Sequence, residues 1–360
     1  MPACVFITHS KFVKMPLVPT NFTYFLGIDF SKATIDLSLI DHTGQKLCKP
    51  FKVPNNAKGF AQLLVELERH ENITKDNLMI IGEHTGRYCL LMAHLLIGDG
   101  WLFWLDNPTQ IKKRIGIQKG KSDAKDAFQI AQYGRRYADE FVAYQPKTEL
   151  LLQLDVLLKQ YESCMRSYKS LMLNYKDTTQ TLIDCDIALD EELVSSYQCQ
   201  IDQLKSHMAL LEKKMDALIQ SDQKLNKQVK LVMSIPGIGR KTARNFALYT
   251  NGFTRLISAA ELKSYCGVAP FVYESGTSVK KRSRVHPHAN KRLKTLLHLG
   301  ALSVIRYPGE LQTYYNRKVA EGKNKMLVLN NIRAKLIDRI VAVIKRNTPY
   351  LKSSDDLLLS

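Results

Sequence analysis

Two long heptad series constrain the fold of this chain more than any other feature of its sequence. In residues 151–175, and again in residues 194–218, apolar or aromatic side chains recur three and four positions apart for more than three repeats. This spacing is typical of a helix with one continuous apolar seam. We therefore expect two long helices over residues 148–226, paired as an antiparallel coiled-coil hairpin or a dimerisation arm. Packing of both helices inside a helical domain is the alternative interpretation.

The segment before the heptads, residues 22–147, has the pattern of an α/β domain. Its strand-like runs TYFLGIDF and TIDLSLID precede alternating helical and strand-like runs, among them the helical AKGFAQLLVELERH and the apolar NLMIIGE. A strand hairpin followed by alternating helices and strands is the element order of a ribonuclease-H-like (RuvC-like) fold. We therefore predict an α/β domain of this kind, followed by α-helical parts.

Residues 227–350 indicate a third, mainly helical unit, which opens with SIPGIGRKTARNFALYT. Gly237 and Gly239 would let the backbone approach a phosphate closely, and free N–H groups at the start of the next helix would bind it. Arg240 and Lys241 add positive charge. The segment resembles the helix-hairpin-helix element of DNA-binding proteins, and a plain turn between helices is the alternative.

The ends of the chain and its cysteines indicate little structure or chemistry. We expect residues 1–21 to be a poorly structured extension, with Met15 as an alternative start, and residues 351–360 to be a frayed tail. Residues 4–7 are too short an apolar piece for a signal peptide. Seven cysteines without a CxxC pair predict neither a disulfide framework nor a zinc site, and they fit a reducing cytoplasm.

The net charge of +18 points to a polyanionic partner. Nucleic acid or an anionic membrane would serve, but no apolar run approaches the length of a membrane-spanning helix. Residues 280–346 alone hold seventeen Lys or Arg and only three acids. Such a local excess favours a nucleic-acid-binding face over general solubility.

Four acidic residues have the placement of metal ligands. Asp29 and Glu83 each end an apolar strand-like run, and Asp123 and Asp126 lie three positions apart at an expected helix start, so that they share one helix face. Four carboxylates can hold one or two Mg²⁺ ions, which would polarise a phosphodiester. Turn or capping roles are the alternative, with Ser122 competing with Asp123 for the cap.

A serine in the stretch FVYESGTSVKKRSR, residues 271–284, is the candidate nucleophile. Ser275 precedes a glycine and a basic run, which suits either an ordinary loop or attack on a polyanion. A serine nucleophile needs a base or a metal to take its proton, and no Ser–His–Asp spacing is visible nearby. Metal held by carboxylates of the first domain would activate Ser275 if the domains meet.

The order of these motifs resembles one family closely. GIDFSK, GEHTG, DNP, KSDAKDA, the heptad insert, SIPGIGRKTA, YCGVAPFVYESGTSV and a basic helical end follow one another over about residues 23–350. This is similar to the transposases of the insertion-sequence 110 family, also called bridge-RNA-guided recombinases, and to the related Piv invertases. The resemblance implies a RuvC-like domain with a DEDD metal site, a coiled coil, and a C-terminal transposase domain with a catalytic serine.

Carried over motif by motif, the resemblance implies that Asp29, Glu83, Asp123 and Asp126 hold Mg²⁺ and that Ser275 forms a covalent phosphoserine link to DNA. It also implies a homodimer or homotetramer, donor and target DNA, a guiding noncoding bridge RNA, and a cytoplasmic, nucleoid-associated protein of a bacterium or archaeon. The expected nucleic-acid contacts are Lys112, Lys113, Arg114, Lys121, Gly237, Gly239, Arg240, Lys241, Lys280, Lys281, Arg282, Arg284, Lys291 and Arg292. The alternatives are a structure-specific endonuclease that uses a metal-activated water, and a catalytically silent nucleic-acid-binding protein.

Overall fold

The computed structural model describes residues 22–116, 123–254, 258–269, 271–275, 279–284 and 289–351. The chain divides into two compact units, residues 1–146 and residues 147–360. The expected extension over residues 1–21, the contact at Lys121, the competing cap at Ser122 and the tail beyond residue 351 lie outside the described residues. Among the described helices, none combines the length and the apolarity that a membrane crossing requires.

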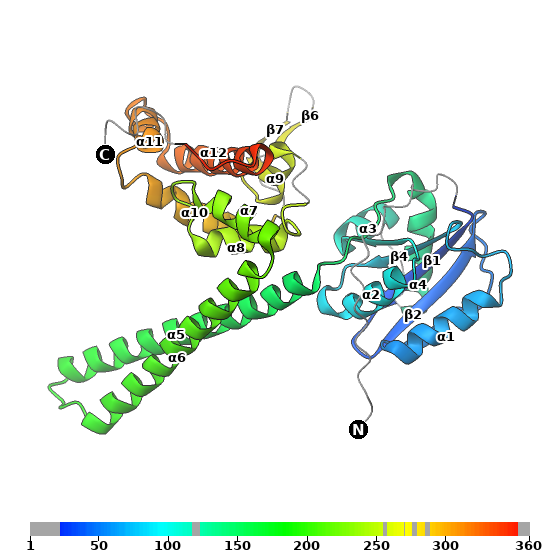
Figure 1. Ribbon diagram of the computed structural model, residues 1–360, viewed down its shortest axis with the longest axis horizontal. Helices are drawn as coiled ribbons and strands as arrows, with labels where there is room; N and C mark the ends of the chain where they lie inside the picture. Colours follow the sequence, from blue (N-terminus) through cyan, green and yellow to red (C-terminus); the bar gives the residue numbers. More distant parts are fainter. Residues whose placement is uncertain are drawn as a thin grey trace. The chain divides into compact units, whose positions relative to one another are not determined.

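Unit 1 is built on a five-stranded sheet with the order β3-β2-β1-β4-β5 (Figure 1). Strands β1, β2 and β3 are antiparallel neighbours, whereas β4 and β5 run parallel to β1. This order and these directions define a ribonuclease-H-like sheet, as the sequence predicted. The strands are Tyr24–Phe30, Thr34–Asp41, Phe51–Pro54, Leu78–Glu83 and Phe103–Asp106.

Helices cover both faces of this sheet. Because strand residues alternate between the two faces, Leu26 and Ile28 pack with helices α1 and α2, while Phe25 packs on the other face with α3 and α4. Their bounds are Ala57–Glu68 for α1, Leu90–Gly98 for α2, Pro108–Ile115 for α3 and Asp123–Arg136 for α4, with short 3₁₀ turns η1 at Gly86–Cys89 and η2 at Ala138–Glu140.

One glycine sets how closely α4 approaches the sheet. A Cβ atom on Gly27 of β1 would lie 2.1 Å from the carbonyl oxygen of Ala127 and 2.4 Å from the backbone nitrogen of Ala131. No side chain fits there, so the backbone of α4 rests almost directly on the backbone of β1. At Gly134, further along α4, a Cβ atom would lie 2.9 Å from the side chain of Ile81 in β4. Small residues on both elements therefore fix the position of α4.

Unit 2 begins with a long helical hairpin, α5 over Glu149–Asp184 and α6 over Glu191–Gln220. Thr148 and Asp190 cap the two helices through side-chain oxygens. Away from its base the hairpin has a small core of its own, formed by Cys164, Met208 and Leu211. Its base joins the main core of the unit, so the helices both pair with each other and pack inside a helical domain. A role in dimerisation stays a prediction.

The rest of unit 2 is a helical cluster around α12, whose Ile332, Leu336 and Ile340 are fully buried. A two-stranded antiparallel hairpin, β6 and β7, extends from it (Figure 1). The elements are α7 Gln223–Met233, α8 Arg240–Tyr249, α9 Ala259–Tyr265, β6 Phe271–Ser275, β7 Val279–Arg284, α10 Lys291–Val304, α11 Glu310–Ala320 and α12 Lys325–Arg346.

Candidate functional site

A row of acidic residues crosses four neighbouring strands of unit 1. Asp29 of β1 pairs with Asp36 of β2, and Glu83 of β4 pairs with Asp106 of β5. Asp29 and Glu83 stand one position beyond the Ile28–Gly82 pair, so they are next to each other on adjacent strands. By strand alternation all four share the face that α4 covers. The sheet therefore brings together two of the sequence-predicted ligands.

Helix α4 brings a third carboxylate to the same edge. Ala127, near the start of α4, lies over Gly27 of β1. Gly134, further along the helix, lies over Ile81 and near Met79 of β4. Ile81 is level with Gly27 in the sheet, and Met79 lies two residues earlier in β4. The start of α4 therefore points toward the carboxyl ends of β1 and β4. Asp126 directly precedes Ala127 and is half-buried. Asp123 is the first residue of the helix, one turn earlier.

The two outer members of the row are held by neighbours. The Asp36 carboxylate forms an ion pair with Lys52 of β3 at 3.2 Å. Asp106 accepts a hydrogen bond from the Tyr133 hydroxyl through Oδ2 and one from the Asn107 backbone through Oδ1, each at 2.7 Å. Burial, and next the hydrogen bond to Asp106, raise the pKa of Tyr133. These contacts hold the outer pair in place.

The inner members are better placed for a cation. Asp29 and Glu83 are half-buried at the end of their strands, where solvent can reach them. Two ionised carboxylates on strands about 4.8 Å apart repel by about 3 kcal/mol at an effective dielectric constant of 20. A hard divalent ion would relieve this repulsion, and its preferred ligands are carboxylate oxygens. Asp29, Glu83 and Asp126 are thus the described side chains that could hold Mg²⁺, and a ligand role for Asp123 stays a prediction.

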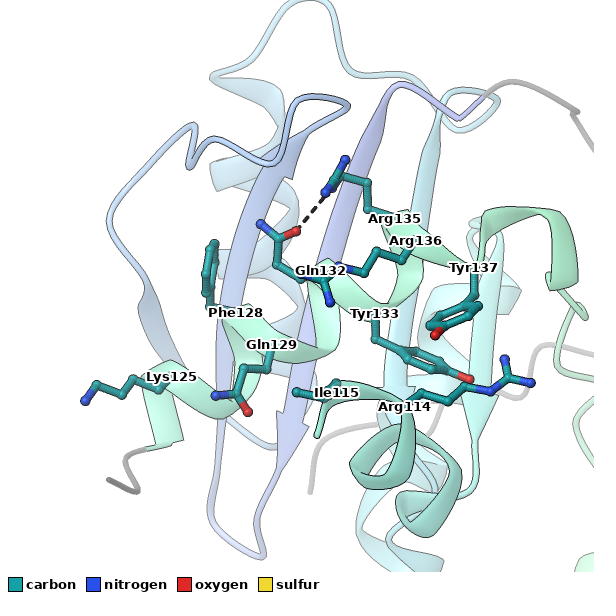
Figure 2. Close-up of a pocket in the computed structure, with 10 residues that line it drawn as sticks. All are labelled: Arg114, Ile115, Lys125, Phe128, Gln129, Gln132, Tyr133, Arg135, Arg136 and Tyr137. Carbon is teal, nitrogen blue, oxygen red and sulfur yellow. Dashed lines mark hydrogen bonds between the residues drawn. The ribbon is translucent and has the colours of Figure 1, made fainter. Parts of the chain in front are cut away.

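A basic pocket of about 520 Å³ lies between the end of α3 and α4 (Figure 2). Figure 2 shows the lining side chains spread along α4 and the end of α3, with Arg114, Tyr133 and Tyr137 close together; none of the lining residues is acidic. Tyr133 is buried and the rings of Phe128 and Tyr137 are half-buried, so it is the positive charge of the pocket that suits contact with phosphate. The lining residues are Arg114, Ile115, Lys125, Phe128, Gln129, Gln132, Tyr133, Arg135, Arg136 and Tyr137.

The predicted basic contacts of α3 differ in their surroundings. Lys112 and Lys113 are exposed on the helix. Arg114 instead forms an ion pair with Glu140 at 2.7 Å, and its guanidinium lies 4.6 Å from the centre of the Tyr137 ring. Its charge is therefore partly compensated. Arg135 and Arg136, at the other end of the pocket, were not predicted as contacts although they follow KSDAKDA on the same helix.

The candidate nucleophile belongs to unit 2. Ser275 is the last residue of β6, opposite Val279 at the start of β7. Lys280 pairs with Glu274 and Lys281 with Tyr273. Arg282 and Arg284 complete the basic strand β7. The predicted run of positive charge thus forms the strand that pairs with the serine's strand.

Two further predicted contacts lie at the start of α10, where Lys291 is exposed. Arg292 is paired with Glu162 of α5 at 2.5 Å. That ion pair ties α10 to the base of the helical hairpin, so the charge of Arg292 serves the fold of unit 2.

The predicted phosphate-binding turn between α7 and α8 contains two glycines whose surroundings differ. Gly237 has φ +85°, and a Cβ there would lie 2.4 Å from Val304 and 2.7 Å from the Gly300 carbonyl oxygen of α10. Its glycine character is thus explained by packing against α10. Gly239 is exposed at the cap of α8, and a Cβ atom there would have nothing within 4 Å.

The two basic residues after this turn point back to the helical hairpin. Arg240 forms an ion pair with Asp216 of α6 at 2.8 Å. Lys241 lies 5.1 Å from the centre of the Tyr161 ring, and burial, followed by the charge of Arg292, lowers its pKa. Both side chains therefore attach α8 to α5 and α6.

Comparison with known proteins covers both units. Residues 26–178 match a family model described as a transposase of the DEDD type from IS110, and residues 229–316 match one described as "Transposase IS116/IS110/IS902 family". The chain is 30% identical over 333 residues to the pilin gene-inverting protein of Moraxella lacunata, which spans 91% of this chain and 98% of that protein. The chain belongs to the IS110 family of transposases.

Two further comparisons show weaker similarity to this IS110-family transposase. An uncharacterized 43.6 kDa protein of insertion element IS110 from Streptomyces coelicolor is 30% identical over 120 residues, 33% of this chain and 29% of that protein. The T. thermophilus RuvC structure in complex with a Holliday junction substrate is 15% identical, with a TM-score of 0.25, and covers 34% of this chain and 98% of that one.

Sequence reasoning missed two members of the acidic row in this transposase. Asp106 ends the apolar run WLFWLD just as Asp29 and Glu83 end theirs, so the same strand-end signal was present. Asp36 lies inside a strand, and only its pairing with Asp29 reveals its place in the row.

Proposed function

We propose that this transposase is a Mg²⁺-dependent DNA recombinase that works through a covalent phosphoserine intermediate. Asp29, Glu83, Asp123 and Asp126 would hold one or two Mg²⁺ ions, which when bound supply charge neutralisation at the scissile phosphate. The observation that carries this proposal is the adjacent placement of Asp29 and Glu83 at one sheet edge, toward which α4 directs Asp126. Family membership supports it.

In the proposed reaction the Ser275 oxygen attacks the phosphorus of the DNA backbone. One Ser–O–P bond forms, one P–O bond of the DNA breaks, and the leaving oxygen ends as a free hydroxyl after gaining a proton. One phosphodiester is exchanged for another. A DNA hydroxyl can therefore attack the phosphoserine phosphorus in the reverse step and rejoin the DNA without an energy source. The lysines and arginines of β7 would neutralise phosphate charge beside the serine.

The serine is tested by looking for the protein–DNA adduct. Ser275→Ala should abolish the covalent adduct on DNA carrying the element's own ends while leaving nucleic-acid binding nearly unchanged. Ser303→Ala, on an exposed face of α10 in the same unit, is the matched control and should keep the adduct. An adduct that persists in Ser275→Ala removes this serine from the reaction.

The metal site is tested separately at one carboxylate. Glu83→Gln keeps the size of the side chain and removes its charge, so strand cleavage in Mg²⁺ should stop. Glu68→Gln, exposed on α1, makes the same chemical change away from the edge and should cleave normally. Equal cleavage by the two variants would refute a ligand role for Glu83.

We further propose that a structured noncoding RNA guides the enzyme to donor and target DNA, with the protein contacting RNA shape and backbone while base pairing selects sequence. The pocket of Figure 2 supports this, because its cations suit contact with a phosphate backbone. Arg136→Glu should weaken RNA binding and flatten its salt dependence. Lys58→Glu, exposed on α1 across the sheet, should change neither, and equal effects of both would refute a role for the pocket.

An assembly of two or four copies completes the proposal. Large apolar side chains near the tip of the helical hairpin are exposed, among them Leu173, Ile183 and Ile187. Contact between copies through this tip would cover them. Replacing Leu173 and Ile183 with lysine should shift the protein toward the monomer in sedimentation, and an unchanged mass would exclude this surface.

Hydrolysis by a metal-activated water is the second candidate. It is favoured by the fact that all the proposed carboxylates belong to unit 1, whereas Ser275 belongs to unit 2. Product analysis separates the two, since hydrolysis leaves free phosphate ends without attached protein.

A further inference from the structure

A second cluster of metal-ligating side chains lies in unit 1, on the opposite side of the sheet from α4. The Cys48 sulfur, a Glu66 carboxylate oxygen and an imidazole nitrogen of His70 all lie within 4.8 Å of one another. Cys48 is in the connection between β2 and β3, Glu66 is in the last turn of α1, and His70 follows the end of that helix. All three are half-buried.

One atom of this cluster lacks a hydrogen-bonding partner. The Nε2 atom of His70 is buried and has no hydrogen bond, although the backbone of His70 is held on both sides, by Leu67 and by Ile73. A buried polar nitrogen is normally paired. The same ring places one of its nitrogens within 4.8 Å of a thiol sulfur and a carboxylate oxygen, and a cation bound there would coordinate all three groups.

We propose that Cys48, Glu66 and His70 bind a divalent transition-metal ion, with Zn²⁺ the best match. Sulfur, nitrogen and oxygen ligands together suit Zn²⁺, whereas Mg²⁺ prefers oxygen alone. Tetrahedral ligands around Zn²⁺ stand about 3.5 Å apart, so the three side chains need to close by about 1 Å on binding. Water would take the fourth position.

The residues around this site give solvent access to Glu66 and place one cation, Arg69, in competition for its carboxylate. Glu66 and Arg69 line a shallow surface hollow of about 360 Å³, so solvent reaches the cluster on the side of Glu66. Arg69 forms an ion pair with Glu66, and its side chain is 68% exposed, so the pair is weak and one carboxylate would be shared between guanidinium and metal. Arg69→Ala should therefore tighten metal binding.

The site would join two parts of the unit that the chain connects only through β3. A bound ion would tie the β2–β3 connection, which carries Cys48, to the end of α1. Strand β3 is short and lies at the edge of the sheet, where pairing is on one side only. The expected role is structural and does not depend on the proposed recombination chemistry.

Cobalt is the direct probe of this site, because Co²⁺ replaces Zn²⁺ and gives a charge-transfer absorption band when bound to a thiolate. The full-length protein, freed of metal by a chelator, should show the band on addition of one equivalent of Co²⁺. Added Zn²⁺ should remove it, and excess Mg²⁺ should not. Cys48→Ser should lose the band, while Cys185→Ser, at an exposed cysteine of unit 2, should retain it.

Affinity and stability supply the second measurement. His70→Gln should bind Zn²⁺ at least about tenfold more weakly than the wild type, and Zn²⁺ should raise the unfolding midpoint of unit 1 in the wild type only. Co²⁺ absorption that survives in Cys48→Ser, or Zn²⁺ affinity equal in His70→Gln and wild type, would overturn the assignment.

Discussion

Gly27→Ala tests how the fold builds the carboxylate edge. The new methyl carbon would sit 2.1 Å from the carbonyl oxygen of Ala127, whereas real contacts of this kind are at least 3.0 Å long. Helix α4 must therefore retreat from β1 by about 1 Å, which loosens contacts along its whole buried face. Overpacking of this kind costs about 3 kcal/mol.

The same retreat moves Asp126 away from Asp29. A displacement of about 1 Å at a reacting site can lower a rate about 100-fold. Cleavage in Mg²⁺ should thus fall by about two orders of magnitude, even under conditions where unit 1 remains folded. Stability and activity are expected to fail together because one backbone contact supports both.

Tryptophan fluorescence makes the stability measurement specific to unit 1. The two tryptophans of the chain, Trp101 and Trp104, are buried in or beside β5, so their signal follows this unit alone. With a urea m-value of about 2 kcal/mol/M, a loss of about 3 kcal/mol lowers the midpoint by about 1.5 M.

A matched variant separates close packing from the general effect of replacing glycine. Gly98 ends α2 with nothing within 4 Å of a new Cβ atom, so Gly98→Ala should leave the midpoint unchanged or raise it slightly. If Gly27→Ala unfolds at the wild-type urea concentration and cleaves DNA normally, α4 does not rest on β1 as described, and the argument fails.

Three other predictions concern buried polar groups. Tyr133→Phe removes the hydrogen bond to Asp106 and should lower the unfolding free energy of unit 1 by about 1–2 kcal/mol in the same fluorescence assay; no change would mean that water replaces the hydroxyl. Arg333 of α12 is 7% exposed, its Nε has no hydrogen-bonding partner, and burial lowers its pKa. Arg333→Met should therefore stabilise unit 2 by about 1 kcal/mol or more in thermal unfolding followed by circular dichroism. A lower unfolding midpoint would show that the guanidinium is paired. Burial raises the pKa of Cys266 to about 12, above its ordinary value of 9.0, so unit 2 should lose stability as pH rises from about 9 toward 12. In the native protein, iodoacetamide should modify exposed Cys185 but not buried Cys266, which peptide masses would reveal.

Much of the architecture could be predicted because the spacing of apolar residues along the sequence specifies helices and strands. The heptads of residues 151–175 and 194–218 specify long helices, since an apolar seam every three and four residues must be covered. Apolar runs that end in Asp29 and Glu83 specify strands with a carboxylate at the tip. Family membership followed from the order of short motifs, each of which is local.

What the sequence left undecided depends on which distant backbones meet. Asp106 could be recognised as a strand-end carboxylate, but strand register decided that Asp36 and Asp106 line up with Asp29 and Glu83, because a shift of one residue would turn each side chain to the other face. Position 237 requires glycine because the turn packs closely against α10, and no pattern in the turn reveals this contact. Cys48 and His70 are 22 positions apart and form no motif, yet the β2–β3 connection and the end of α1 bring them together. Spacing along the chain predicts elements, whereas contact between elements decides which side chains share a site.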